Sequence, residues 1–163
     1  MAYRPILWQG IRYESYSEIA VGEVLESYID GWKVAPGISF QVLFGGQFKV
    51  DFVVGQLLIE YHPFRTPWRV KSEGLPRAQR LSKIKSMANQ AARSYENKRR
   101  TQIDHACPGR ELVVVGSGRE LLEDVIRRCS QCRLPALSRF EHDFDNRIKE
   151  LAGCREVRAS VVA

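Results

Sequence analysis

The sequence predicts an α/β fold in which a mixed sheet is flanked by helices, with elements in the order α-β-β-β-α-β-α. A segment with helical periodicity follows Ser15, and three strand signals separated by glycine turns fill residues 38–62. A long polar helix and one short apolar strand come next. The 163 residues are enough for one domain with a buried core, and their 44% hydrophobic content excludes a disordered chain.

The first helix is expected to begin at Ser15 and to end at Asp30-Gly31. Ser15 and Glu18 fit a capping box, in which each side chain accepts a hydrogen bond from an amide at the helix start. Ahead of the helix, residues 7–14 are expected to form a strand or a hairpin that turns at Gln9-Gly10. The apolar residues of the helix recur at helical spacing: Ile19, Val21, Val24, Leu25, Tyr28 and Ile29.

Three strands are expected at residues 38–44, 48–54 and 57–62, with tight turns at Gly45-Gly46 and Gly55-Gln56. These strands supply most of the predicted sheet. After these strands, the sequence predicts a helix at 77–104, a buried strand at 111–116, a helix that begins at Ser117, and a last helix at 139–152.

The Gly55-Gln56 turn predicts a register for the hairpin that it joins. In a two-residue loop Val54 faces Leu57, so Asp51 lies opposite Glu60 and Lys49 lies opposite His62. Because side chains alternate along a strand, these four polar residues are expected on one face of the sheet. The other face is expected to take the apolar residues of the hairpin: Val50, Phe52, Ile59 and Tyr61.

Two opposed carboxylates in an apolar hairpin repel each other, so this pair needs an explanation. A divalent cation between Asp51 and Glu60 is one, because Mg²⁺ is held by one or two carboxylates with water completing its shell. Protonation of one carboxyl group is another. A third is a solvated sheet margin at which Lys49 and an arginine neutralise both charges.

Positive charge is concentrated in residues 65–100, which hold eleven basic and two acidic residues. This segment carries +9, whereas the whole chain carries +6, so the rest sums to −3. A local positive surface is typical of proteins that bind nucleic acids, although a solvated helix face has the same composition. The basic residues that we expect to contact DNA are Lys49, Arg65, Arg69, Arg80, Lys83 and Lys85.

Four cysteines form a possible structural zinc site. Cys129 and Cys132 make a C-x-x-C pair, Cys107 precedes the strand at 111–116, and Cys154 follows the last helix. The topology brings the first three toward one end of that strand. Buried or surface thiols are the alternative, and His105 and His142 are alternative ligands.

The chain is expected to be cytoplasmic and to have no contact with a membrane. It has no run of about 18 apolar residues, and its first ten residues lack the basic and apolar regions of a signal peptide. Reduced cysteines follow from that location.

The acidic positions resemble the motifs of the PD-(D/E)XK nuclease superfamily, the family with the restriction-endonuclease-like fold. That family has an α-β-β-β-α-β core, with an acidic residue on the first helix, Asp on the second strand and Glu-x-Lys on the third. Ser15-x-Ser17-Glu18-Ile19 resembles the first motif, Val50-Asp51-Phe52 the second and Ile59-Glu60-Tyr61-His62 the third. The residues ahead of Glu18 are also similar to small prokaryotic and phage members.

The resemblance covers about residues 7–128. It implies a nuclease core at residues 1–128, including a basic helical segment at 65–104, and a helical extension with cysteines at 129–163 of the same domain. It further implies a homodimeric DNA endonuclease that uses Mg²⁺ or Mn²⁺. The implied metal ligands are Glu18, Asp51, Glu60 and the backbone carbonyl of Tyr61.

The chain departs from the family pattern at His62, which stands where the family usually has lysine. His62 can act as a general base because the pKa of histidine lies near neutral pH. Lys49, Lys83 or Lys85 are alternative sources of the missing cation. An inactive DNA-binding module and an RNA-directed nuclease are the competing functions. Glu18 could instead serve only to cap the first helix. In that case Glu23 or Glu26 of the same helix would be the metal ligand.

Overall fold

The fold is taken from a computed structural model that describes residues 5–35, 39–41, 47–62 and 77–159. Side chains are described for most of these, but not at 39–41, 47–48 and 158–159 or over much of the first half of the long helix. The elements are β1 (Ile6–Trp8), β2 (Ile11–Tyr13), α1 (Tyr16–Tyr28), β3 (Ser39–Gln41), β4 (Gln47–Lys49), β5 (Phe52–Val54), β6 (Leu57–Tyr61), α2 (Arg77–Ala106), β7 (Glu111–Val115), α3 (Gly118–Glu120), the π-helical η1 (Leu121–Ile126), α4 (Arg127–Cys129), α5 (Leu137–Gly153) and α6 (Arg155–Ala159).

A three-stranded mixed sheet lies at the centre of the fold, in the order β5-β6-β7. Strand β6 pairs antiparallel with β5 and parallel with β7, so the crossover from β6 to β7 contains α2. Two antiparallel pairs, β1-β2 and β3-β4, accompany the sheet. The α/β class and the mixed sheet are therefore confirmed.

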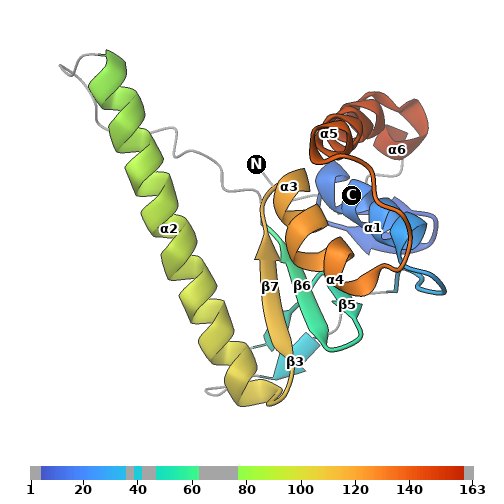
Figure 1. The fold of residues 1–163 in the computed structure, drawn as a ribbon, viewed down its shortest axis with the longest axis horizontal. Helices are drawn as coiled ribbons and strands as arrows, with labels where there is room; N and C mark the ends of the chain where they lie inside the picture. The colour runs from blue at the N-terminus through green and yellow to red at the C-terminus, as the bar shows by residue number, and fades with distance from the viewer. Residues whose placement is uncertain (1–4, 36–38, 42–46, 63–76, 160–163) are drawn as a thin grey trace.

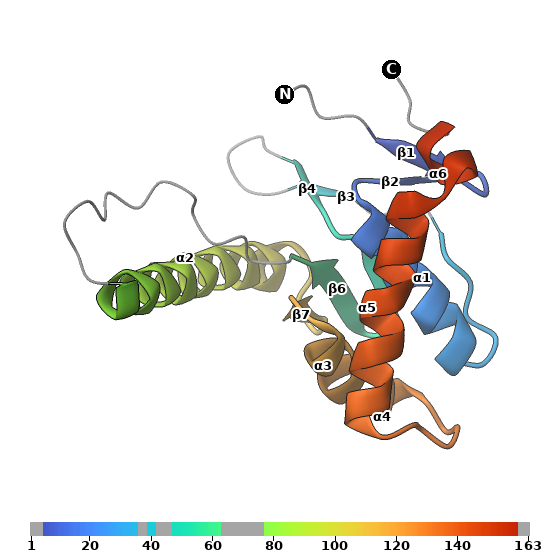
Figure 2. The same cartoon turned by 90° about the horizontal axis from the view of Figure 1, so that it is seen from above.

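The sheet separates two layers of helices (Figures 1 and 2). Helices α1 and α3 to α5 cover one face, where Phe52, Ile59 and Val113 of the sheet belong to the main hydrophobic core. Helix α2 lies on the other face and packs only its C-terminal part on it, with Ile103 in a second, smaller core. None of the helices in the described part of the chain, α2 included, is both long and apolar enough to cross a membrane.

The predicted strand at 48–54 is interrupted at Val50 and Asp51. Beyond the interruption, Phe52 pairs with Ile59 and Val54 with Leu57, which confirms the predicted register of the Gly55-Gln56 hairpin. Gly55 has a φ of 57°, a backbone conformation that favours glycine in such a turn.

Two details of that hairpin were predicted wrongly. Val50 is fully buried with Leu58 and Ile103 on the α2 face, and not with Phe52 on the other face. The expected ladder pair of Asp51 with Glu60 is also absent from the described pairing, because the Asp51 amide donates to the carbonyl of Ile59 at 3.1 Å. The interruption ends the alternation of side chains, so face assignments do not carry across it.

The helix starts follow the sequence. Ser15 caps α1 and Ser117 caps α3, since each serine hydroxyl accepts a hydrogen bond from the amide three residues on. The four apolar residues after α3 are buried as expected, within the π-helical turn η1. Helix α5 is longer than predicted at both ends, and the short helix α6 was not predicted.

Candidate active site

Glu18 lies in the first turn of α1, with 9% of its surface exposed. One carboxylate oxygen accepts a hydrogen bond from the Glu14 amide at 2.7 Å, while the Glu18 amide donates to the Ser15 hydroxyl at 3.2 Å. The capping interaction is therefore real, and it fixes the carboxylate at the start of the helix. Gly22 on the same helix permits close packing, because a Cβ there would lie 3.0 Å from Val34.

The alternative ligands on α1 are engaged away from this position. Glu23 forms a two-pronged ion pair with Arg147 of α5, at 2.6 and 2.8 Å. Glu26 accepts a hydrogen bond from the Val34 amide at 2.8 Å. Glu18 is therefore the acidic residue of α1 that faces the sheet interruption.

Asp51 lies where the strand is interrupted, and its side chain is partly buried. Its carboxylate accepts a hydrogen bond from the Tyr61 amide at 2.8 Å. The side chain thus takes the place of a backbone acceptor at the end of the β5-β6 ladder. This bond connects Asp51 to the backbone of Tyr61, the residue that was expected to contribute a carbonyl ligand.

Glu18 and Asp51 form a pair of carboxyl groups that disfavour each other's charge. Burial raises the pKa of Glu18 from 4.5 to about 8, and the negative charge of Asp51 adds to the increase. Burial likewise raises the pKa of Asp51 from 3.8 to about 7, against the Tyr61 hydrogen bond, and the charge of Glu60 adds to it. Pairs of acids with strongly raised pKa values are typical of catalytic and metal-binding sites.

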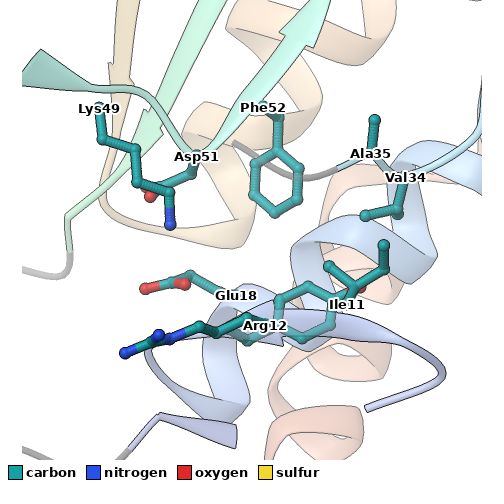
Figure 3. Close-up of a pocket in the computed structure, with 9 residues that line it drawn as sticks. Ile11, Arg12, Glu18, Val34, Ala35, Lys49, Asp51 and Phe52 are labelled. Atoms are coloured by element: carbon teal, nitrogen blue, oxygen red, sulfur yellow. The ribbon is translucent and has the colours of Figure 1, made fainter. Parts of the chain in front are cut away.

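The pair lines a small pocket between the β1-β2 hairpin, α1 and β5 (Figure 3). Lys49 and Arg12 bring positive charge to the pocket, Lys49 from the Asp51 side and Arg12 from the Glu18 side. Apolar side chains close its other end. The residues that line the pocket are Ile11, Arg12, Tyr13, Glu18, Val34, Ala35, Lys49, Asp51 and Phe52.

Glu60 lies outside this pocket and has 6% of its surface exposed. One of its carboxylate oxygens is 3.6 Å from Nε of Arg99, which α2 contributes from the other face of the sheet. Its charge still acts on Asp51, as the pKa of Asp51 shows. The acidic residues therefore form a row from Glu18 through Asp51 to Glu60, with Arg99 at its end.

His62 follows β6 and is half-buried, and its amide donates to the carbonyl of Val115 at 2.9 Å. Burial and the positive charge of Arg99 lower the pKa of His62 below its usual value of 6.5. The imidazole is therefore neutral at physiological pH, which is the form that can accept a proton.

The donor set suits a hard divalent cation better than zinc, because it consists of carboxylate oxygens. Within residues whose side chains are described, no three His, Cys, Asp or Glu side chains lie close enough together to hold a metal ion. The site is therefore a pair, Glu18 and Asp51, and Glu60 stays a predicted ligand that the structure places beside Arg99. Two carboxylates are sufficient for Mg²⁺ when water and a substrate phosphate complete the shell.

The four cysteines, all of which are described, are free thiols and are not gathered into a zinc site. Cys129 and Cys154 pack at the margin of the main core, while the exposed Cys132 lies 3.8 Å from the Asp30 carboxylate. Helix α4 ends at Cys129, and Cys132 lies in the segment between α4 and α5. The structure therefore favours the alternative of buried and surface thiols.

The predicted DNA contacts are only partly described. Lys49 is exposed beside the site. Arg65 and Arg69 lie outside the described residues, and Arg80, Lys83 and Lys85 belong to α2 but their side chains are not described.

Sequence reasoning missed Arg12 and Arg99. Arg12 alternates with Ile11 and Tyr13 on β2, so the hairpin pattern could have placed it on the polar side. Arg99 gave no such signal, because the helix pattern does not show which basic residue of α2 reaches the sheet.

Comparison of the chain with protein-family models, with curated proteins and with solved structures gives no match. The function is therefore argued from the site alone.

Proposed function

We propose that this protein is a metal-dependent endonuclease that hydrolyses phosphodiester bonds in DNA. The observation that carries the proposal is the convergence of Glu18 and Asp51, two carboxyl groups with raised pKa values, beneath two basic side chains. Burying two acids against each other costs free energy, so their position is better explained by function than by stability.

The order of the strands supports a restriction-endonuclease-like core. If β4 and β5 are the two halves of one bent strand, the pairing runs from β3 through β4/β5 and β6 to β7, with α1 before it and α2 before its last strand. This is the α-β-β-β-α-β order that the resemblance implies. The bend itself falls at Asp51, the proposed ligand on the second strand.

Mg²⁺ or Mn²⁺ would be held by Glu18 and Asp51, with Glu60 as a third ligand after it separates from Arg99. When bound, such a metal lowers the pKa of water and stabilises negative charge on a phosphate. The Tyr61 amide orients Asp51. His62 does not line the pocket and is influenced by the charge of Arg99; in this proposal its neutral form would be the proton acceptor. Lys49 supplies a positive charge that the family usually takes from lysine at position 62.

DNA is the expected substrate because positive charge is local and because the exposed side chains of Arg12 and Lys49 flank the carboxyl pair. Contacts to the phosphate backbone would dominate binding, which makes it depend on salt. A homodimer would supply two sites for the two strands of a duplex.

The test is the nicking of supercoiled plasmid with Mg²⁺, with Mn²⁺ and with EDTA, by the wild-type protein and by Asp51→Asn. Asparagine keeps an acceptor for the Tyr61 amide but loses the charge. Asp124→Asn is the matched control, because Asp124 is exposed on η1. We expect metal-dependent nicking that Asp51→Asn lowers by at least about 100-fold and that the control retains. Equal activity of the two variants would refute the proposal.

A DNA-binding module without nuclease activity is the second candidate. It is favoured by the contact between Glu60 and Arg99, which occupies a predicted ligand, and by His62 in place of lysine. Salt-dependent DNA binding without nicking under any metal condition would establish this candidate. Preferential cleavage of single-stranded RNA over DNA would instead identify RNA as the substrate.

A further inference from the structure

Two basic side chains reach the carboxyl pair from separate hairpins. Arg12 extends from β2 and Lys49 from the end of β4, and Figure 3 shows their charged ends on either side of the Glu18 carboxylate. The polar ends of all four side chains gather at one end of the pocket, and the apolar lining lies at the other.

Within the described part of the chain, no carboxylate oxygen lies within 4.0 Å of the charged nitrogens of Arg12 or Lys49. Both side chains are exposed. The charge of Lys49 lowers the pKa values of Glu18 and Asp51 from a distance, but this effect is smaller than that of burial. Neither Lys49 nor Arg12 forms a close ion pair such as the one between Arg147 and Glu23 at 2.6 Å. The raised pKa values of Glu18 and Asp51 agree that neutralisation of the acids is incomplete.

We propose that Arg12 and Lys49 together bind one phosphate group of a nucleic-acid strand and hold it over Glu18 and Asp51. The inference rests on the proposed function and names the group of the substrate that the pocket recognises. A phosphodiester carries one negative charge on two free oxygens, which a guanidinium group can bind with two parallel hydrogen bonds. The lysine adds a point charge from the opposite side.

This placement defines where the strand lies on the protein. The bound phosphate sits between the β1-β2 and β3-β4 hairpins, on the side of the sheet that faces α1. Helix α2 packs on the other face, so its basic residues contact a different part of the nucleic acid. Removing Arg12 should therefore subtract one phosphate contact and leave the α2 contacts intact.

The probe is a fluorescent 20-base-pair duplex, titrated in EDTA at pH 6.5 over a range of NaCl concentrations. The variants are Arg12→Gln, Arg12→Lys and Lys49→Gln, with Arg133→Gln and Lys149→Gln as matched controls at exposed positions. The slope of log K against log salt is negative, and each lost phosphate contact reduces its magnitude by about 0.9. We expect that loss for Arg12→Gln and Lys49→Gln, wild-type slopes for the controls, and a smaller loss for Arg12→Lys.

Circular dichroism of each variant excludes loss of fold as the cause. Wild-type slopes for both Arg12→Gln and Lys49→Gln would overturn the inference, and the nuclease proposal would survive if the wild type still nicks plasmid. Reduced slopes in a protein that never nicks plasmid would support the phosphate site and refute the nuclease. No binding of the duplex by the wild type would overturn the inference.

Discussion

Asp51 and Glu18 are acids whose protonation the fold strongly favours. Both side chains are acids whose charged forms are disfavoured, because the protein excludes water from them and places them near each other. Each therefore binds its proton more tightly in the folded protein than in the unfolded chain. The sign of the pH dependence of stability follows directly.

The metal-free protein should lose stability as the pH rises. The contribution of the pair is fully present below about pH 4, where both acids are protonated in the folded and unfolded states, and it is lost as the pH rises through the folded pKa values of about 7 and 8. We expect a decrease on the order of 1–3 kcal/mol in unfolding free energy. Thermal unfolding in EDTA at pH 5.5 and pH 8.5 measures it.

Asp51→Asn should weaken that pH dependence, because it removes one of the two titrating groups and the repulsion on the other. It should also raise the melting temperature at pH 8.5, whereas Asp124→Asn should not. A wild-type protein that is more stable at pH 8.5 than at pH 5.5 in EDTA would contradict the described electrostatics.

At the scale of one element, the start of α1 combines a cap with the site. The Ser15 hydroxyl accepts from the Glu18 amide, and the Glu18 carboxylate accepts from the Glu14 amide. The two interactions have different functional consequences, because only Glu18 points into the pocket. Variants at the two positions therefore separate capping from chemistry.

Ser15→Ala should cost about 1 kcal/mol of stability, the usual loss for an N-cap, and should leave metal binding unchanged. Glu18→Gln keeps an oxygen acceptor for the Glu14 amide, so stability in EDTA at pH 8.5 should be retained or increased, but added Mg²⁺ should no longer stabilise the protein. Urea unfolding with and without Mg²⁺ measures both. If Mg²⁺ no longer stabilised Ser15→Ala but still stabilised Glu18→Gln, Glu18 would be only a capping residue.

The interrupted strand was predicted only in part from the sequence. Alternation and turn chemistry predicted the pairing of Phe52 with Ile59, and the capping box at Ser15 was also predicted from local residues. Val50 was placed on the wrong face, because the chain bends between Val50 and Phe52 and packs Val50 against Ile103 of α2. That contact joins segments about fifty residues apart, and no local pattern records it.

Part of the candidate site was also predicted from the sequence and part was not. Asp51 and Glu18 were predicted from motif spacing and do converge, but the separation of Glu60 from them depends on Arg99. The zinc site stays a prediction, and among the described residues the cysteines are free thiols outside any cluster of three potential ligands. The alternation of residues on β2 indicates a polar side for Arg12, but its position beside Glu18 depends on how the β1-β2 hairpin packs near α1.

At the scale of the whole molecule, the long basic helix α2 and the helix α1 lie on opposite faces of the sheet (Figure 2). The charge of α2 lies along a helix that packs on the sheet mainly through its C-terminal part, at Ile103. The basic residues of this helix are predicted from the sequence to contact several phosphates of one nucleic-acid duplex.

Replacing both Lys83 and Lys85 by glutamine should therefore weaken duplex binding in proportion to the lost charge. The magnitude of the negative slope of log K against log salt should decrease by about 1.8, because each lost phosphate contact removes about 0.9. Fluorescence anisotropy over a salt series measures it, and Lys149→Gln is the control. An unchanged slope would mean that this part of α2 does not contact DNA.

The central claim is that Glu18 and Asp51 form a metal site whose protons a divalent cation displaces. Isothermal titration calorimetry of Mn²⁺ at pH 7, in buffers of different ionisation enthalpy, counts the protons released. At pH 7 an acid with a pKa of about 8 is mostly protonated and one with a pKa of about 7 is half protonated, which predicts release of about 1.4 protons per metal. Asp51→Asn should abolish the binding. Absence of Mn²⁺ binding by the wild type, or binding without proton release, would contradict the claim.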